Sequence, residues 1–202
     1  MARTVRGERP PSLGEIRAAF FRNLNLGQAR SHSPTSSQLL DAFVQAGARS
    51  PSHVGTNGTV VYYHPAGPSL LRRVQALLVP LCGYRDMATV RSASALMTLE
   101  RRLRDLDEGE VVLYDASTGF DLPTPIETDD GLVVVDLDHR RAITQHRPGT
   151  RPTSAGPFVA SLVGVPVTVR SIATMRRVAD RVRQYAATRP YPLGQGASRI
   201  TP

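Results

Sequence analysis

The chain of 202 residues has a single cysteine and no lysine. Because Cys82 stands alone, an intrachain disulfide, a cysteine-rich zinc site and a CxxC redox pair are all excluded. The thiol lies in the apolar stretch PLCGY, and this setting is typical of a small buried side chain rather than of a reactive nucleophile.

Long hydrophobic runs are also absent. No stretch approaches the roughly 20 apolar residues that a membrane-spanning helix needs. The opening residues MARTVRGERPPS contain basic side chains, but no apolar segment of the kind found in secretory signals follows them. We therefore expect a soluble cytoplasmic protein without a membrane partner.

Catalytic signatures are missing as well. The sequence contains no G-x-S-x-G elbow, P-loop, Rossmann fingerprint or HExxH motif. Asp136, Asp138 and His139 lie close together, but their position between two predicted strands favours a hairpin turn over a metal site. We expect no cofactor and no metal. The sequence leans away from an enzyme, although it leaves open an acid/base pair built from distant carboxylates.

What the chain has is positive charge, +8 with an isoelectric point near 10.7. Such a field attracts polyanions, so nucleic acid or another anionic ligand is the expected partner. Arginine supplies all of the Lys+Arg total, and its guanidinium suits bidentate phosphate contacts and stacking on bases. The alternative is codon bias toward arginine, because the arginines are spread along the chain rather than gathered in one run.

Helical and extended patterns alternate along the chain. Helices are predicted from Ser33 as N-cap to Gly47, from Pro68 to Pro80, after Ser92, around 158–163 and from Ser171. These helices alternate with predicted strands. The first hairpin, in SHVGTNGTVVYYHP, has a short extended segment, an Asn57-Gly58 turn and the strand TVVYY. The other strands are DMATVRS, EVVLYD, the hairpin GLVVVDLDHRRAITQH, and VPVTV.

The stretch SLGEIRAAFFRNLNLGQAR contains conflicting local signals. Ser12 with Glu15 three residues later is a capping-box pattern, which predicts a helix. However, IRAAFF is short and apolar at both odd and even positions, as a central strand with two buried faces would be. We interpret the stretch as a strand and the capping pattern as a false local signal.

With that strand, residues 14–92 follow the order strand, helix, strand, strand, helix, strand. Residues 93–187 approximate the same order again. We therefore predict an α+β fold of two tandem ferredoxin-like halves packed together. Residues 1–13 are predicted to form a flexible basic arm, and residues 188–202 a Pro/Gly-rich tail.

Four stretches carry a family resemblance: AAFFRNLNLGQARS, QLLDAFVQAGA, VGTNGTVVYY and GVPVTVRSIATMRRVADRV. Over residues 15–186 the chain resembles a bacterial family known only as domain of unknown function 1697. The family's usual residues stand at Arg22, Asn25, Gly27, Gly58, Val60, Val61, Tyr62, Gly164, Val165, Pro166, Arg170 and Thr174. The resemblance implies an α+β fold of ferredoxin-like character and no established catalytic activity.

Departures from the family pattern identify the chain as a divergent member. Asn23 and Gln28 stand where glycine is usual, and Asn57 and Thr59 replace serine and asparagine. Ile172 and Ala173 replace a Trp-Asn pair. Side chains at positions 23 and 28 would crowd a close approach of a ligand to the backbone.

Two sets of residues are candidates for ligand binding. Tyr62 and Tyr63 lie on a predicted central strand, where aromatics of related RNA-binding modules stack bases; core packing is the alternative. The loop RNLNLGQAR follows a strand and precedes a helix, and its residues Arg22, Asn23, Asn25, Gln28 and Arg30 suit an anion site. A simple connecting turn is the alternative for the loop.

Three functions therefore remain. The first is a binding protein for an anionic ligand such as nucleic acid. The second is small-molecule binding or catalysis in a cleft between the halves, near RNLNLGQ. The third is an interaction protein that oligomerises.

Overall fold

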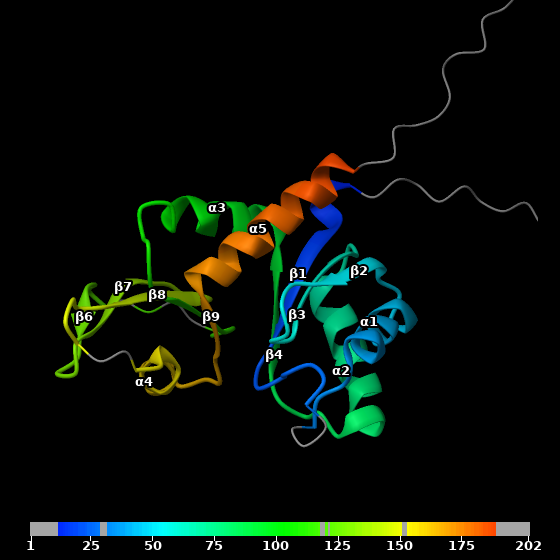
Figure 1. Ribbon diagram of the computed structural model, residues 1–202, viewed down its shortest axis with the longest axis horizontal. Coiled ribbons are helices and arrows are strands. Elements are labelled where there is room, and N and C mark those ends of the chain that lie inside the picture. The colour runs from blue at the N-terminus through cyan, green and yellow to red at the C-terminus, as the bar shows by residue number, and fades with distance from the viewer. Residues whose placement is uncertain (1–11, 29–31, 118–119, 121, 151–152, 189–202) are drawn as a thin grey trace, which may run out of the picture.

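The computed structural model describes residues 12–28, 32–117, 120, 122–150 and 153–188, and these form two antiparallel sheets with five α-helices (Figure 1). The first sheet contains β1 (Ile16–Phe21), β2 (Arg49–His53), β3 (Thr59–Tyr63) and β4 (Ala88–Ser92). The second contains β5 (Glu110–Leu113), β6 (Ile126–Glu127), β7 (Leu132–Leu137), β8 (Arg141–His146) and β9 (Thr168–Ser171). The helices are α1 (Ser36–Gln45), α2 (Gly67–Cys82), α3 (Ala93–Arg102), α4 (Ala155–Val163) and α5 (Ile172–Ala187). The predicted α+β class is confirmed.

The strand orders of the two sheets are related. The first sheet runs β2-β3-β1-β4 and the second runs β6-β7-β8-β5-β9. In each sheet the strand that comes first in the chain is central, and the strand that comes last is an edge. β6 is an extra strand of two residues that the sequence patterns did not predict.

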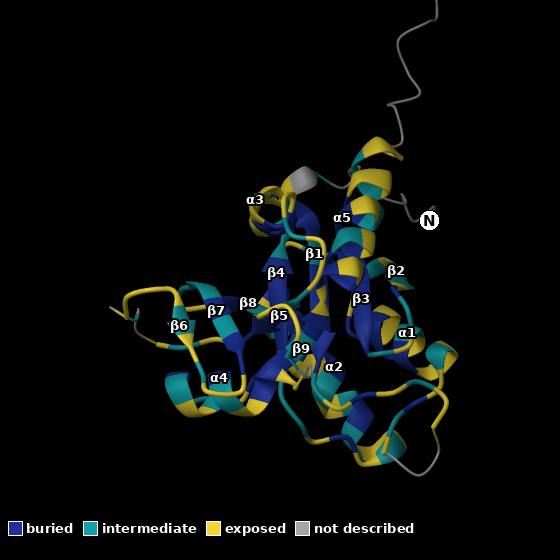
Figure 2. Cartoon of the chain, turned by 60° about the vertical axis from the view of Figure 1, so that its left-hand side comes forward, coloured by how far each residue is buried: buried dark blue, intermediate teal, exposed yellow. Residues whose placement is uncertain are grey.

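Helices cover faces of both sheets, and two of them also pack between the sheets. α1 and α2 cover one face of the first sheet, and α4 covers one face of the second. α3 and α5 pack between the sheets and share one core cluster with β1, β3, β5 and β8 (Figures 1 and 2). The first sheet is therefore buried on both faces, which explains why β1 is apolar at nearly every position.

The opening stretch contains both predicted structures in succession. The Ser12 amide donates to Glu15 Oε2 at 2.7 Å, and the Glu15 amide donates to the Ser12 carbonyl at 2.9 Å. These bonds close one turn of 3₁₀ helix, η1 (Leu13–Glu15), before β1 begins at Ile16. The strand prediction is confirmed. Only half of the capping pattern forms, because the Glu15 amide bonds the Ser12 carbonyl rather than its hydroxyl, and it produces one turn of 3₁₀ helix instead of an α-helix.

Two helix boundaries also differ from the predictions. α1 begins after Thr35, whose hydroxyl accepts the Gln38 amide, whereas Ser33 accepts the Asn25 amide instead. Pro80 lies inside the last turn of α2 rather than ending it. The helix stops at Gly83, whose φ of 77° is the left-handed conformation that glycine adopts without strain.

Some predictions fall outside the described residues. These are the basic arm up to residue 11, the tail from residue 189 onward, and Arg30. Within the described part of the chain, no helix is long and apolar enough to cross a membrane.

Candidate functional site

Two short strings occur twice in the sequence and take equivalent places in the fold. TVRS forms residues 89–92 and 168–171, which are the edge strands β4 and β9 with the serines that cap α3 and α5. AGP forms residues 66–68 and 155–157, at the start of the helices that precede those strands. The two sheets therefore end in the same helix and strand unit.

The glycine of each AGP string packs on the valine of the following TVRS string. A Cβ added at Gly67 would lie 3.0 Å from Val90 Cγ2, and one at Gly156 would lie 3.1 Å from Val169 Cγ2. Both contacts are tighter than ordinary van der Waals packing. Glycine thus permits α2 and α4 to lie close against β4 and β9.

Strand register fixes which other residues correspond. Arg91 of β4 is paired with Ala18 of β1, and Arg170 of β9 is paired with Val111 of β5. Counting forward along the central strands from these pairs, Phe21 corresponds to Tyr114. The next residues, Arg22 and Asp115, therefore occupy equivalent positions.

Arg91 is 6% exposed and reaches from the first sheet into the second. Its guanidinium donates to the carbonyls of Tyr114 and Arg140, at the ends of the second sheet's central strands. Asp115 Oδ1 lies 3.1 Å from Arg91 Nη1 and neutralises it, while also accepting from Arg140. This cross-sheet arginine is a paired charge.

Arg170 makes the reverse crossing and is 5% exposed. It donates to the Phe21 carbonyl at 2.9 Å, the Asn57 carbonyl at 2.6 Å and Thr59 Oγ1 at 2.9 Å, and its remaining N–H groups bond within β9. All five guanidinium donors thus bond to neutral acceptors. No carboxylate pairs with Arg170 among the described residues, and burial lowers its pKa to about 10.

The two arginines therefore differ in charge balance. Arg91 has Asp115 beside it, whereas the position equivalent to Asp115 beside Arg170 holds Arg22. A second positive charge replaces the carboxylate. Arg22 lies 3.6 Å from Asp86 Oδ1, whereas Arg170 has no carboxylate partner among the described residues.

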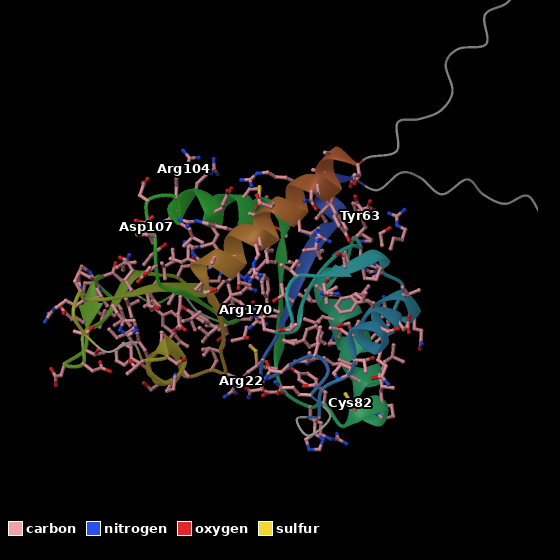
Figure 3. The ribbon with its side chains drawn as sticks, in the orientation of Figure 1. Arg22, Tyr63, Cys82, Arg104, Asp107 and Arg170 are labelled. Atoms are coloured by element: carbon pink, nitrogen blue, oxygen red, sulfur yellow. The ribbon has the colours of Figure 1, made fainter. Side chains whose placement is uncertain are left out.

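A pocket of about 520 Å³ opens at this place, and we call it the loop pocket. Figure 3 labels Arg22 and Arg170, which both line it, at the seam between the two sheets. The other lining residues are Phe21, Asn23, Leu24, Asn25, Asn57, Ser154, Gly156, Pro157, Ala160, Val167, Thr168 and Val169. The pocket joins the loop after β1 to the start of α4.

Arg22 and Asn23 share one partner outside the pocket lining. Arg22 Nη1 lies 3.6 Å from Asp86 Oδ1, and the Arg22 side chain is 42% exposed. Asn23 adopts a φ of 51° and donates from Nδ2 to Asp86 Oδ2 at 2.8 Å. Asn23 therefore anchors the loop, while the long, exposed Arg22 ion pair leaves its guanidinium accessible.

Of the other predicted loop residues, Asn25 lines the pocket and Gln28 does not. The Asn25 amide nitrogen is held by Ser33 Oγ at 3.0 Å, and the residue lines the pocket. Gln28 is exposed and lies outside the pocket lining. The structure thus brings together Arg22, Asn23 and Asn25 from the predicted set.

The prediction that Tyr62 and Tyr63 stack bases is wrong. Tyr62 is 0% exposed on the α1/α2 side, with its ring centroid 5.0 Å from that of Phe43. Tyr63 is 7% exposed on the α3/α5 side, stacks on Tyr185 and donates to the Tyr185 carbonyl at 2.6 Å. Because both faces of the first sheet are covered, neither ring is available to a nucleotide.

The segment DLDHRR forms a turn, as predicted. Asp138 Oδ1 accepts the amides of Arg140 and Arg141 at 2.7 and 2.9 Å, which fixes the β7–β8 hairpin. Across the described stretches of the chain, no cluster of three or more His, Cys, Asp or Glu residues is placed to hold a metal ion.

Sequence reasoning missed the role of Arg170 in this site. Arg170 matched a family motif, but its contact with Phe21 spans 149 residues and no local pattern indicates it. The available signal was the repetition of TVRS and AGP. An aligned repeat would have paired Arg91 with Arg170.

No family model matches the chain, and no curated protein sequence matches it either. Among solved structures, the chain is similar to the conserved bacterial protein SP0830 from Streptococcus pneumoniae, with a TM-score of 0.58 and 14% sequence identity. The similarity covers 84% of this chain and 98% of that chain, and at this identity it shows a shared fold alone. Membership of the domain of unknown function 1697 family stays a prediction.

Proposed function

We propose that the protein binds a small anionic molecule in the loop pocket. The observation that carries the proposal is the missing carboxylate: buried Arg170 has no acidic partner among the described residues, and Arg22 stands where Asp115 neutralises Arg91. An unpaired buried charge is costly, so an anion bound there gains more than it would at an exposed arginine.

The two arginines have different roles in this proposal. Arg170 has no free donor, so it acts on the ligand through its charge alone. Arg22 is accessible, and its planar guanidinium suits two parallel hydrogen bonds to a carboxylate or phosphate. Asn25 and Asn57 add amide groups at the pocket wall.

The size of the pocket favours a small molecule. A volume of about 520 Å³ falls within the range of roughly 300–1,000 Å³ typical of small-molecule sites. Buried Tyr62 and Tyr63 remove the stacking platform that single-stranded nucleic acid would need. A carboxylate- or phosphate-bearing metabolite-sized ligand is therefore favoured over a polynucleotide.

We also propose that each half of the chain is ferredoxin-like. The order β1-α1-β2-β3-α2-β4 and the strand arrangement β2-β3-β1-β4 support this for the first half. In the second half β5, β7, β8 and β9 repeat that arrangement, with a long connection containing β6 in place of the first helix.

Thermal unfolding in the presence of anions tests the binding proposal. Inorganic phosphate or succinate should raise the melting temperature in a saturable manner, whereas neutral glycerol at equal concentration should not. Arg22→Gln should raise the anion concentration needed for half-saturation by about tenfold or more, since hydrogen bonds to charged groups are worth about 1.5–3 kcal/mol.

Arg104→Gln is the matched control. Arg104 is exposed just after α3 and lies at the far end of the molecule from Arg22 in Figure 3. Like Arg22→Gln, Arg104→Gln removes one positive charge, but at a residue outside the pocket lining. Equal losses in the two variants, or no saturable effect of either anion on the unmodified chain, would refute the proposal.

A further inference from the structure

A second pocket, of about 530 Å³, lies at the other TVRS strand. It is bounded by the start of α2, the end of β4, one side of α3 and the β7–β8 turn, and we call it the hairpin pocket. It is formed at the end of β4, as the loop pocket is formed at β9, and the two share no lining residue.

Most of the charges in the hairpin pocket are already paired. Asp115 accepts from Arg91 and Arg140, and Arg141 pairs with Asp136 and Asp138. The β7–β8 turn is therefore close to neutral, even though it presents consecutive arginines. It does not by itself attract an anion.

Arg17 is the exception. It donates from Nη2 to the Pro65 carbonyl at 3.0 Å, and it forms no ion pair within the described part of the chain. Its Cδ lies 3.3 Å from where a Cβ on Gly67 would be, so its side chain runs beside the first turn of α2. Ala66 offers no side chain to cap that turn. The positive charge of Arg17 therefore lies beside the start of α2, where the helix dipole is also positive.

Part of the pocket wall is apolar. The exposed apolar residues are Pro65, Ala66, Pro68 and Ala95, and beneath them lie the buried side chains of Val90, Leu96, Leu99 and Leu113. Ala95 is an exposed residue of α3 that lines the pocket. A ligand here would bury carbon atoms along α3 while its charge stays near Arg17.

The geometry points to a second binding site, in which an organic acid with an apolar body places its carboxylate or sulfonate at Arg17 and its body against Pro65, Pro68 and Ala95. This ligand differs in class from that of the loop pocket. The loop pocket concentrates charge around two arginines, whereas the hairpin pocket offers one unpaired arginine and a larger apolar wall.

Fluorescence of anilinonaphthalene sulfonate, an aromatic acid with an apolar body, tests this assignment on the full chain. The dye should bind saturably, and octanoate should displace it. Octanol should displace it at least about tenfold less well because it lacks the charge that Arg17 pairs with. Inorganic phosphate should not displace it, which separates this site from the loop pocket.

Three variants locate the dye. Arg17→Gln should weaken dye binding by about tenfold, as expected for loss of one charge-assisted hydrogen bond. Ala95→Trp should abolish displaceable binding by filling the pocket from an exposed helical position. Arg72→Gln, on the exposed side of α2 outside the pocket, should bind the dye like the unmodified chain.

Circular dichroism of each variant confirms that folding is intact. Loss of displaceable binding in Ala95→Trp and weakening in Arg17→Gln, with Arg72→Gln unchanged, support the second site. Unchanged binding in Ala95→Trp, equal effects of Arg17→Gln and Arg72→Gln, or equal displacement by octanoate and octanol would overturn it.

Discussion

At the scale of single residues, Arg22 and Asp115 give equivalent positions of the two sheets opposite charges. Both follow the central strand of a sheet, and both lie beside an arginine that crosses from the other sheet. Asp115 makes its crossing arginine a paired charge. Arg22 leaves Arg170 without a carboxylate partner among the described residues, and the proposed anion site rests on this difference.

The two AGP glycines yield a prediction at the same scale. Gly156→Ala should lower the free energy of unfolding by about 1–3 kcal/mol, because the new methyl group meets Val169 Cγ2 at 3.1 Å in a packed layer. Gly67→Ala should behave alike against Val90. Urea denaturation measures both changes.

Gly14→Ala is the control for these substitutions. The nearest atom to a Cβ at Gly14 is Ser12 Oγ at 3.7 Å, and its φ is not left-handed. It should change the free energy of unfolding by less than about 0.5 kcal/mol. A cost for Gly156→Ala no greater than for Gly14→Ala would contradict the close packing of α4 on β9.

At the scale of elements, the arginines of β4 and β9 join each edge strand to the ends of the other sheet. Arg170→Met should lower the free energy of unfolding by about 2–4 kcal/mol, because buried acceptors at Phe21, Asn57 and Thr59 lose their donors. Urea denaturation is again the measurement.

Arg170→Lys distinguishes hydrogen-bond geometry from charge at this junction. An ammonium keeps the charge but cannot span the acceptors that the planar guanidinium reaches, so Arg170→Lys should lose nearly as much stability as Arg170→Met. Stability within about 0.5 kcal/mol of the unmodified chain would mean that charge alone suffices.

Local patterns predicted most elements because they depend on neighbouring residues. TVVYY consists of β-branched and aromatic residues and forms β3 as predicted. Ser92 and Ser171 cap the helices that were predicted after them. Boundaries failed where two local signals competed. Ser33 and Thr35 both suit an N-cap, and only the loop contact with Asn25 shows which residue serves it.

At the scale of the whole molecule, the packing of the two sheets and α5 decides which of the predicted site residues are buried and which line the loop pocket. Tyr63 is buried by Tyr185, 122 residues away, so its exposure could not be inferred from its own strand. Arg22 and Asn25 were found from the sequence because they lie in one loop. Arg170 lies beside them only because its side chain reaches from β9 to the Phe21 carbonyl at the end of β1.

The pH dependence of stability is a property of the whole core. Burial raises the pKa of Tyr62, Tyr84, Tyr114 and Tyr185. Because their ordinary pKa is near 10, their stabilisation is complete below about pH 10 and is lost as pH rises further. Burial lowers the pKa of Arg91 and Arg170 to about 10, which acts in the opposite direction but on fewer groups.

We therefore expect stability to fall above about pH 10, with phenolate absorbance from the buried tyrosines appearing together with unfolding. Parallel measurement of circular dichroism and phenolate absorbance across the alkaline range checks this. Ionisation of all the tyrosines well before the loss of structure would contradict their burial.

The central claim is that a bound anion in the loop pocket takes the place of the carboxylate that Asp115 provides beside Arg91. Arg22→Asp combined with Asp86→Asn places a carboxylate at the position equivalent to Asp115, and it avoids repulsion between the new carboxylate and Asp86. Calorimetric titration with inorganic phosphate or succinate measures the effect most directly. We predict that binding of these anions disappears, while the anion-free variant melts no lower than the unmodified chain. Binding retained at full affinity would contradict the claim.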